Sequence, residues 1–220
     1  MIDELRKRIP GEEFDYQALL DALKEYARPR DKITSLLKSR SVVRVKKGLY
    51  VFGENYARRP FSREILANMI YGPSYISLEY ALSYYDMIPE RAEAVTSVTC
   101  KRTRRFSTPI GLFLYRTVPL AAFWIGVDRV DIDTDRGFLI AVLEKALADK
   151  IQDDRGTGIR TQTEMLQYLI ESLRIDESML HQLNAEMLSQ IAKAYRSRKI
   201  LLLSNLIRRF KRSAKEVSHA

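Results

Sequence analysis

The first sixty residues contain a helical hydrophobic stripe followed by two alternating runs. The stripe has the spacing of one helix face, with apolar side chains at Tyr16, Leu19, Leu20, Leu23, Tyr26 and Ala27. Asp15 is a suitable N-cap for this helix, and Pro29 ends it. A second helix is predicted from about Arg30, because three apolar residues share one of its faces: Ile33, Leu36 and Leu37.

Two β-type runs follow the second helix, Val42 to Val45 and Leu49 to Phe52. Gly48 lies between them and can adopt a positive φ, so the segment predicts a tight β-hairpin. Helix, break, short helix and hairpin together have the layout of a winged helix-turn-helix. In such a module the second helix enters the major groove of DNA and the hairpin lies on the phosphates. The alternatives are an ordinary helix-hairpin with a solvated basic rim, or a module for protein contacts.

The pattern beyond residues 53–62, a linker-like segment, mixes helices and strands. Ser62 and Ser77 are expected to start helices. Two β-type runs, at residues 94–100 and 112–118, bracket a basic turn, and helical spacing continues from Leu139 to Ile151. Thr161 has capping-box spacing with Glu164 for the first of three later helices. The second of these is expected to bury apolar residues at 180–195, and the third at 203–210.

These patterns predict an α+β fold in two domains. Residues 1–58 form the N-terminal winged helix-turn-helix in this prediction. Residues 62–220 form a mixed α/β C-terminal domain that ends in a run of helices. At 220 residues the chain is long enough for each domain to bury a core of its own.

Positive charge is concentrated in two blocks of the chain. The net charge is +9 and the pI about 9.6. Residues 28–59 hold ten basic against two acidic residues, and residues 193–216 hold nine against one. In contrast, residues 128–190 hold seven basic and thirteen acidic residues. This segregation favours a polyanion-binding face over a surface of scattered lysines.

The first basic block supplies the candidate DNA-binding residues. Serine and threonine suit base edges or phosphates, while lysine and arginine neutralise phosphates. Opposite the apolar face of the second helix lie Asp31, Ser35 and Lys38, flanked by Lys32, Thr34 and Ser39. The candidates on this helix and hairpin are Arg30, Lys32, Thr34, Ser35, Lys38, Arg40, Arg44, Lys46 and Lys47.

A possible second basic surface comprises two groups of residues. The first group is typical either of a nucleic-acid or acidic-partner contact or of a solvated hairpin end. The second is on the last helix, where the helix dipole favours cations in any case. The residues are Lys101, Arg102, Arg104, Arg105, Arg208, Arg209, Lys211 and Arg212.

The residue inventory argues against an enzyme and suggests no metal or cofactor. The two histidines, His181 and His219, have no partner nearby in the sequence. Three aspartates at 131, 133 and 135 alternate with other residues, which an edge strand or a solvated turn explains more readily than a metal cluster. No Glu-x-Lys nuclease motif and no glycine-rich phosphate loop occurs. Cys100 lies beside two cations but lacks a general base, so a structural thiol is the better interpretation.

The chain start and the apolar runs indicate a cytoplasmic protein without membrane contact. The first ten residues lack the apolar core of a signal peptide. The longest apolar run, residues 119–127, is too short to span a bilayer. A single cysteine also fits a reducing compartment.

Four segments in order, "PRDKITSLLKSRSVVRVKKGLYVF", "YISLEYALSYYDMI", "VTSVTCKRTRRFSTPIGLFLYRTVP" and "FLIAVLEKALADKI", resemble the AbiEi antitoxins of bacterial type IV toxin–antitoxin systems, which serve in phage defence. The resemblance covers roughly residues 14–151. It implies a winged helix that binds inverted repeats in its own promoter and represses transcription. It also implies a C-terminal antitoxin domain that opposes an AbiEii-type nucleotidyltransferase toxin, with or without a stable complex. The DNA-reading helix then falls on residues 30–39 and the wing on Arg44, Lys46, Lys47 and Gly48.

Two other functions remain open at this point. One is a winged-helix regulator whose C-terminal domain senses a ligand or a partner unrelated to any toxin. The other is an RNA-binding accessory protein that uses the same basic surfaces.

Overall fold

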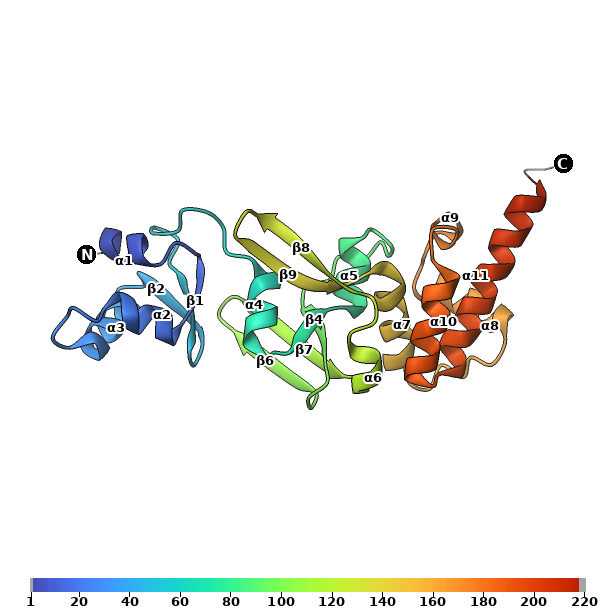
Figure 1. Cartoon of the computed structure of the whole chain (residues 1–220), viewed down its shortest axis with the longest axis horizontal. Helices are drawn as coiled ribbons and strands as arrows, with labels where there is room; N and C mark the ends of the chain where they lie inside the picture. Colours follow the sequence, from blue (N-terminus) through green and yellow to red (C-terminus); the bar gives the residue numbers. More distant parts are fainter. Residues whose placement is uncertain (1, 218–220) are drawn as a thin grey trace.

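The computed structural model describes residues 2–217, with side chains up to Arg212. Figure 1 shows three parts in a row along the longest axis. A small N-terminal module lies at one end, a sheet with flanking helices in the middle, and a group of helices at the other end (Figure 1). The last helix extends beyond the body of the molecule.

The N-terminal module combines three helices and three strands. Its elements are α1 (Ile2–Arg8), β1 (Glu13–Asp15), α2 (Tyr16–Ala22), α3 (Pro29–Lys38), β2 (Val42–Lys46) and β3 (Leu49–Phe52). The strands form an antiparallel sheet in the order β1-β3-β2. The predicted second helix and hairpin are confirmed, as is the cap that Asp15 makes by accepting from the amide of Ala18. The first helix is shorter than predicted: it ends at Ala22 and not at Pro29, so Tyr26 and Ala27 lie outside it and are exposed. The sequence did not predict α1 and β1.

Five apolar side chains show how the module builds its own core. Leu19 of α2, Leu36 of α3 and Phe52 of β3 are buried together with Leu5 of α1 and Phe14 of β1. The rings of Phe14 and Phe52 lie 4.7 Å apart between centroids. Because α1 and β1 contribute to this core, the segment before the first predicted helix is part of the fold.

The middle of the molecule is a six-stranded mixed sheet. Its strands are β4 (Ser74–Ile76), β5 (Val95–Thr99), β6 (Arg104–Thr108), β7 (Gly111–Thr117), β8 (Val127–Asp133) and β9 (Arg136–Ala141). Their order is β6-β7-β5-β4-β9-β8, so β6 and β8 are the edge strands. β5 runs parallel to β7 and β4 parallel to β9, while the other neighbours are antiparallel. The α+β class is therefore confirmed.

Helices cover both faces of this sheet. One face carries α4 (Arg63–Ile70), whose Ala67 carbonyl accepts a hydrogen bond from the Tyr115 hydroxyl of β7. The opposite face carries α5 (Leu78–Tyr84) and α7 (Leu143–Asp153), which contact each other. The short α6 (Leu120–Phe123) follows β7. Ser62 caps α4 as predicted, since its hydroxyl accepts from the amide of Ile65.

The remaining helices form the end of the molecule. They are α8 (Gln162–Gln167), a π-helical turn (Tyr168–Ser172), α9 (Glu177–Leu180), α10 (Ala185–Tyr195) and α11 (Arg198–Val217). The capping box of Thr161 and Glu164 is present as predicted. The helix expected to bury residues 180–195 is instead two helices, because Asn184 caps a new start at α10. None of the helices in residues 2–217 has the length and hydrophobicity of a bilayer span.

Two predicted elements of the sheet were wrong. The basic run 101–106 was expected to be a turn, but Arg104 opens strand β6, which pairs with β7. The helical pattern from Leu139 was expected to be one helix, but residues 139–141 lie in β9. Strand β9 is followed almost directly by helix α7, so the hydrophobic pattern shows no break between them. The end of the strand was therefore counted as part of the helix.

Candidate nucleic-acid interface

Helix α3 presents a polar, basic face to solvent. Pro29 occupies its first turn, where the missing N–H needs no partner. Ile33 and Leu36 are buried in the module core. The opposite side is exposed at Arg30, Thr34, Ser35 and Lys38, with Lys32 partly exposed beside the ring of Tyr26. This is the face that the sequence predicted.

The hairpin that follows α3 carries further cations. Gly48 has φ +87°, a conformation that favours glycine, and it allows β2 to return as β3. Arg44 and Lys47 are exposed. Arg40, with φ +56°, ends the turn after α3 and is also exposed.

Lys46 differs from its neighbours on the hairpin. Its ammonium group donates to the backbone carbonyl of Ile70 at the end of α4 and lies 5.6 Å from the ring centre of Phe106. Partial burial lowers the pKa of Lys46. The sequence predicted that Lys46 contacts DNA. In the structure its ammonium group instead contacts the sheet part of the chain, so it is not part of the candidate interface.

A groove connects this basic region to the sheet. It has a volume of about 550 Å³ and lies between the α3–β2 segment and the β6–β7 turn. Its lining comprises Leu37, Arg40, Val42, Val43, Arg44 and Pro109. Arg40 and Arg44 therefore form part of the wall of this groove.

We call the exposed set on α3 and the hairpin the α3–hairpin surface: Arg30, Lys32, Thr34, Ser35, Lys38, Arg40, Arg44 and Lys47. Within the described residues, the six cations of this set have no side-chain hydrogen bond and no ion pair, although Lys32 lies over the ring of Tyr26. Thr34 donates its hydroxyl to the carbonyl of Arg30, 3.1 Å away, which leaves the hydroxyl oxygen free to accept. Unpaired cations of this kind are available to phosphates without first breaking an internal contact.

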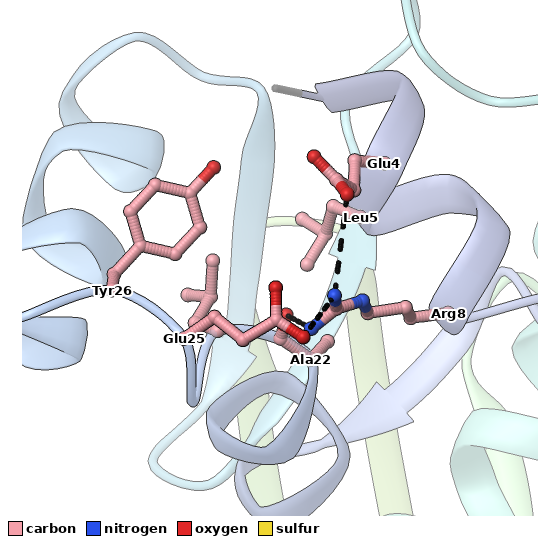
Figure 2. A pocket seen from close by; sticks show the side chains of 7 residues that line it. Glu4, Leu5, Arg8, Ala22, Glu25 and Tyr26 are labelled. Carbon is pink, nitrogen blue, oxygen red and sulfur yellow. Dashed lines mark hydrogen bonds and ion pairs between the residues drawn. The ribbon is translucent and has the colours of Figure 1, made fainter.

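The side of the module that faces α1 has a different character. A smaller pocket there, about 200 Å³, lies between α1 and the turn after α2 (Figure 2). Figure 2 shows Glu4 and Glu25 both pointing toward the guanidinium of Arg8. Arg8 lies 2.7 Å from the Glu25 carboxylate and donates to the carbonyl of Ala22. Since its cation is neutralised internally, this pocket does not extend the basic surface.

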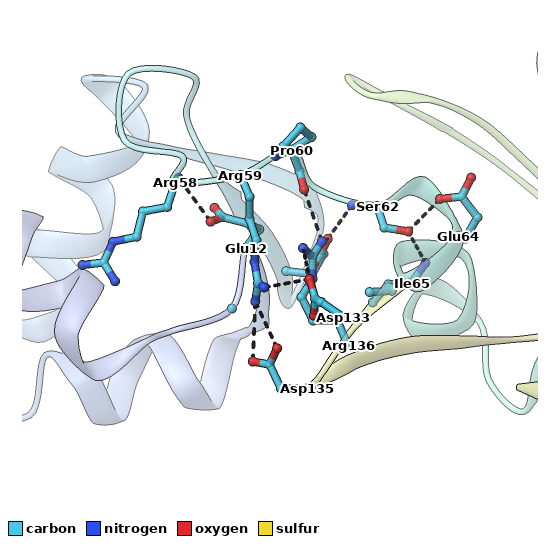
Figure 3. Close-up of polar contacts among 12 residues, drawn as sticks. Glu12, Arg58, Arg59, Pro60, Ser62, Glu64, Ile65, Asp133, Asp135 and Arg136 are labelled. Carbon is cyan, nitrogen blue, oxygen red and sulfur yellow. Dashed lines mark hydrogen bonds and ion pairs between the residues drawn. The ribbon is translucent and has the colours of Figure 1, made fainter. Parts of the chain in front are cut away.

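A group of ion pairs joins the module to the sheet (Figure 3). Arg136 of β9, only 8% exposed, donates to Glu13 of β1 over 2.6 Å. Arg59 of the connecting segment lies 2.7 Å from Asp133 of β8 and 3.4 Å from Asp135. Val45, Leu49 and Val51 of the hairpin also pack into the hydrophobic core of the sheet. One side of the hairpin is therefore packed against the sheet domain, while Arg44 and Lys47 remain exposed to solvent.

The three aspartates near β8 bind arginines in this structure. Asp131 lies 2.6 Å from Arg129, and the other two contact Arg59. The strand is a sheet edge, as one reading of the sequence expected. In the part of the chain that the structure describes, no group of three or more His, Cys, Asp or Glu side chains is placed to hold a metal ion.

The residues of the possible second basic surface lie in two places. Lys101, Arg102, Arg104 and Arg105 are exposed at and before edge strand β6, where Lys101 donates to the carbonyl of Gly72 over 2.6 Å. The other group projects from α11, at the far end of the molecule from α3 (Figure 1). Of that group, Arg208 contacts Glu186 at 3.5 Å, whereas Arg209, Lys211 and Arg212 have no ion pair among the described residues. The structure does not bring these groups into one surface.

His181 and Cys100 have no catalytic arrangement around them among residues 2–217. His181 is exposed at the end of α9, with its ring edge-on to Phe210 at 5.5 Å. Cys100 is partly exposed beyond the end of β5. His219 lies outside the described residues.

A buried polar cluster in the sheet domain was missed from the sequence. Lys145 and Asp149 of α7 are 0% and 1% exposed and lie 2.6 Å apart. Asp149 also accepts hydrogen bonds from the hydroxyls of Ser77, Tyr75 and Tyr195. Burial lowers the pKa of Lys145, while the nearby carboxylate opposes this change. The four-residue spacing of a lysine and an aspartate inside an apolar helix was the available signal.

Ser77 illustrates why the cluster was missed. It was expected to cap α5, and it does occupy the position before the helix, but its side chain makes no cap hydrogen bond. Its hydroxyl instead donates to Asp149 over 2.7 Å. The partner lies 72 residues further along the chain, so no local pattern reveals it.

Comparison with known proteins adds no family assignment. No protein-family model matches the chain, and no match was found among curated proteins.

Proposed function

We propose that this protein is a cytoplasmic DNA-binding repressor that binds duplex DNA through its α3–hairpin surface. The order helix, strand, helix, helix, strand, strand, with the sheet order β1-β3-β2, supports a winged helix-turn-helix. In that reading α3 enters the major groove and the hairpin is the wing.

The observation that carries the proposal is the set of unpaired cations. Arg30 and Lys38 lie on the exposed face of α3, and Arg44 and Lys47 lie on the hairpin. Elsewhere in the module, Arg6 is 4% exposed and lies 2.6 Å from Glu12, and Arg8 lies 2.7 Å from Glu25, while the exposed Lys7 and Lys24 are unpaired among the described residues. Most of the module's unpaired cations thus belong to the α3–hairpin surface, where they can attract an external polyanion.

The side chains of this surface suit two roles. Thr34 and Ser35, at the middle of the exposed α3 face, are placed for base edges, which determine sequence preference. The arginines and lysines around them suit phosphates, which determine affinity and salt dependence.

We further propose that the protein represses its own operon and acts as an AbiEi-type antitoxin against a nucleotidyltransferase-like toxin. Two features support this proposal. The four sequence segments resemble AbiEi antitoxins, and the elements beyond residue 62, which the proposed DNA-binding surface does not use, could carry the antitoxin activity. The inverted repeats of its own promoter are the proposed operator.

Fluorescence anisotropy on labelled duplexes tests the DNA-binding proposal. The purified protein is titrated onto duplex from its own upstream region and onto scrambled duplex of equal length, at several salt concentrations. We expect strong preference for the native duplex near physiological salt. Equal and salt-labile binding to both would overturn the repressor proposal.

The antitoxin proposal has its own test in cells. The gene next to this one in its operon is expressed from an inducible promoter, alone or with this protein, and growth is followed. We expect induction to stop growth and co-expression to restore it. A neighbouring gene that is harmless, or toxicity that persists on co-expression, would contradict the antitoxin role without affecting the DNA-binding claim.

A further inference from the structure

Strand β6 is an edge of the six-stranded sheet, and its outer side is free. All five of its residues pair with β7 without a register shift. The opposite edge, β8, is irregular between Asp131 and Asp133, and Arg59 binds Asp133 there. A bulge or a covering contact blunts a sheet edge, whereas a regular, uncovered edge is a template for another strand. Within the described residues, β6 is therefore the edge of this sheet that can accept a strand.

The register of β6 shows which backbone groups face the free side. Thr108 and Gly111 close a two-residue turn as a hydrogen-bonded pair, so Phe106, two residues along, also bonds to β7. The alternate residues, Arg105 and Ser107, direct their N–H and C=O groups away from β7. Neither residue has another backbone partner among the described residues. Donors and acceptors thus alternate along the edge, as an added strand requires.

Apolar side chains lie on both faces beside this edge. On the α4 face, Phe106 is partly exposed and packs on Tyr71, with 5.7 Å between the ring centroids. On the other face, Leu112 of β7 is opposite Ser107, is partly exposed and belongs to neither hydrophobic core. Leu114, two residues along β7, has the same surroundings. Because serine is small, an apolar side chain of an added strand can extend over Ser107 to Leu112.

The charge of the edge favours acidic side chains on the added strand. Four exposed cations without an ion pair among the described residues lie on β6 and just before it: Lys101, Arg102, Arg104 and Arg105. Arg104 and Arg105 point to opposite faces, because side chains alternate along a strand. Carboxylates on either face of an added strand would therefore meet a cation. The β6 strand of a second copy would instead place cations opposite cations, which is unfavourable.

A nucleic-acid strand suits this edge less well than a peptide. Its phosphates would satisfy the arginines and the outward N–H groups. However, a phosphate backbone has no N–H donors for the carbonyls of Arg105 and Ser107. An extended peptide supplies donors and acceptors at the spacing of a strand, and its alternate side chains meet the apolar residues beside the edge.

We propose that β6 is the docking site for an extended acidic segment of a partner protein, in which acidic and apolar side chains are mixed. The segment adds a strand to the sheet through the backbone groups of Arg105 and Ser107. Its apolar side chains lie on Phe106 and Leu112, and its carboxylates pair with Arg104 and Arg105. The inference does not rest on the proposed DNA binding, because none of these residues belongs to the α3–hairpin surface.

Fluorescence anisotropy with the full-length protein and labelled synthetic peptides tests this site. Aspartate and valine alternate in the first peptide. A second peptide of the same charge has proline in place of each valine, so it cannot pair as a strand. A third has lysine in place of each aspartate. We expect the first peptide to bind, and the other two to bind at least tenfold more weakly. No binding of the first peptide, or equal binding of the proline peptide, would overturn the proposal.

Two substitutions at one position test the backbone contact. Ser107→Pro removes the outward N–H but no hydrogen bond to β7, a change that edge strands tolerate. We expect it to weaken binding of the first peptide about tenfold or more. Ser107→Ala keeps the N–H and should change the affinity less than twofold. Circular dichroism and thermal melting confirm that both variants are folded. Equal affinities of the two folded variants would contradict strand addition.

A charge reversal tests the acidic character of the partner and remains informative if Ser107→Pro does not fold. Arg105→Glu should weaken binding of the first peptide about tenfold. Arg91→Glu makes the same charge change at an exposed position between α5 and β5, and should change the affinity less than twofold. If Arg105→Glu weakens the binding of duplex DNA and leaves peptide binding unchanged, the edge binds nucleic acid and the proposal is wrong.

Discussion

Cations of the α3–hairpin surface and two buried cations of the sheet domain, Lys145 and Arg136, have opposite surroundings. Arg44 and Lys47 are exposed and have no acidic partner among the described residues. Lys145 is fully buried, and Arg136 is 8% exposed; both contact carboxylates at 2.6 Å. Net charge does not distinguish these two groups. The comparison teaches that the free cations indicate a binding surface, whereas the paired cations maintain the fold.

The largest expected effect is on the buried side of this comparison. Replacing Lys145 with methionine leaves Asp149 charged and buried without its cation. We expect a loss of about 3–5 kcal/mol in the free energy of unfolding, measured by urea denaturation. The control is Lys150→Met on the same helix, whose partly exposed pairs with Glu79 and Asp154 should contribute about 1 kcal/mol or less. Equal losses in the two variants would contradict the role of the buried pair.

A smaller loss is expected where the two parts of the chain meet. Arg136→Met removes the contact with Glu13 and the hydrogen bond to the carbonyl of Pro60. We expect about 2–3 kcal/mol of destabilisation, because a charge-assisted buried contact is lost. Arg129→Met is the matched control, since Arg129 pairs with Asp131 in solvent. That variant should lose less than about 0.5 kcal/mol in the same assay.

Two adjacent lysines give the sharpest version of the comparison. Lys46→Met should lower stability by about 1 kcal/mol, because its contact with the Ile70 carbonyl is lost, and should leave the salt dependence of DNA binding unchanged. Lys47→Met should do the reverse: unchanged stability, and a slope of log K against log salt that falls by about 0.9. Urea denaturation and anisotropy measure the two effects. If both variants alter DNA binding equally, the separation of Lys46 from the surface is wrong.

The smallest expected effect is a pH dependence at the start of α4. Burial alone would raise the pKa of Glu64, but hydrogen bonds from Ser62 and Tyr80 outweigh it, so the pKa lies below the usual value of a glutamate. A carboxylate with a lowered folded-state pKa stabilises the protein above its unfolded-state value. That stabilisation is lost as the pH falls through the folded-state value.

Glu64→Gln should therefore lower stability at pH 6 and differ less from the wild type as the pH falls below about 4.3, the usual unfolded-state value. Urea denaturation between pH 6 and 3 checks this. A difference that is constant over the whole range would show that the carboxylate charge has no part in the effect.

The parts of the fold that the sequence predicted depend on local signals. Asp15, Ser62 and Thr161 each cap a helix by accepting from an amide three residues away, and Gly48 lies in the hairpin turn it was expected to make. The α3 face was predicted because its apolar residues share one side. These signals involve residues within one helical turn or one hairpin, so they can be recognised in the sequence without knowledge of the tertiary structure.

The missed parts depend on contacts far apart in the sequence. Lys46 reaches Ile70, 24 residues away, and Ser77 reaches Asp149, 72 residues away. Strand β6 is an edge strand whose two arginines are exposed, so it lacks the apolar alternation of a typical strand. A pocket lined by Val98, Arg116 and Tyr195 forms from five separate segments. Such features become visible only when tertiary packing brings the segments together.

The central claim is that the free cations of α3 and the hairpin bind DNA, and salt dependence tests it most directly. Anisotropy titrations on the native upstream duplex compare the wild type, the Arg44→Glu/Lys47→Glu variant, and the Arg91→Glu/Lys193→Glu variant, which makes the same charge change at exposed positions elsewhere. We predict that the first double variant binds more weakly and that its slope of log K against log salt falls by roughly 1.8, while the second keeps the wild-type slope. Identical slopes in the two double variants would contradict the account.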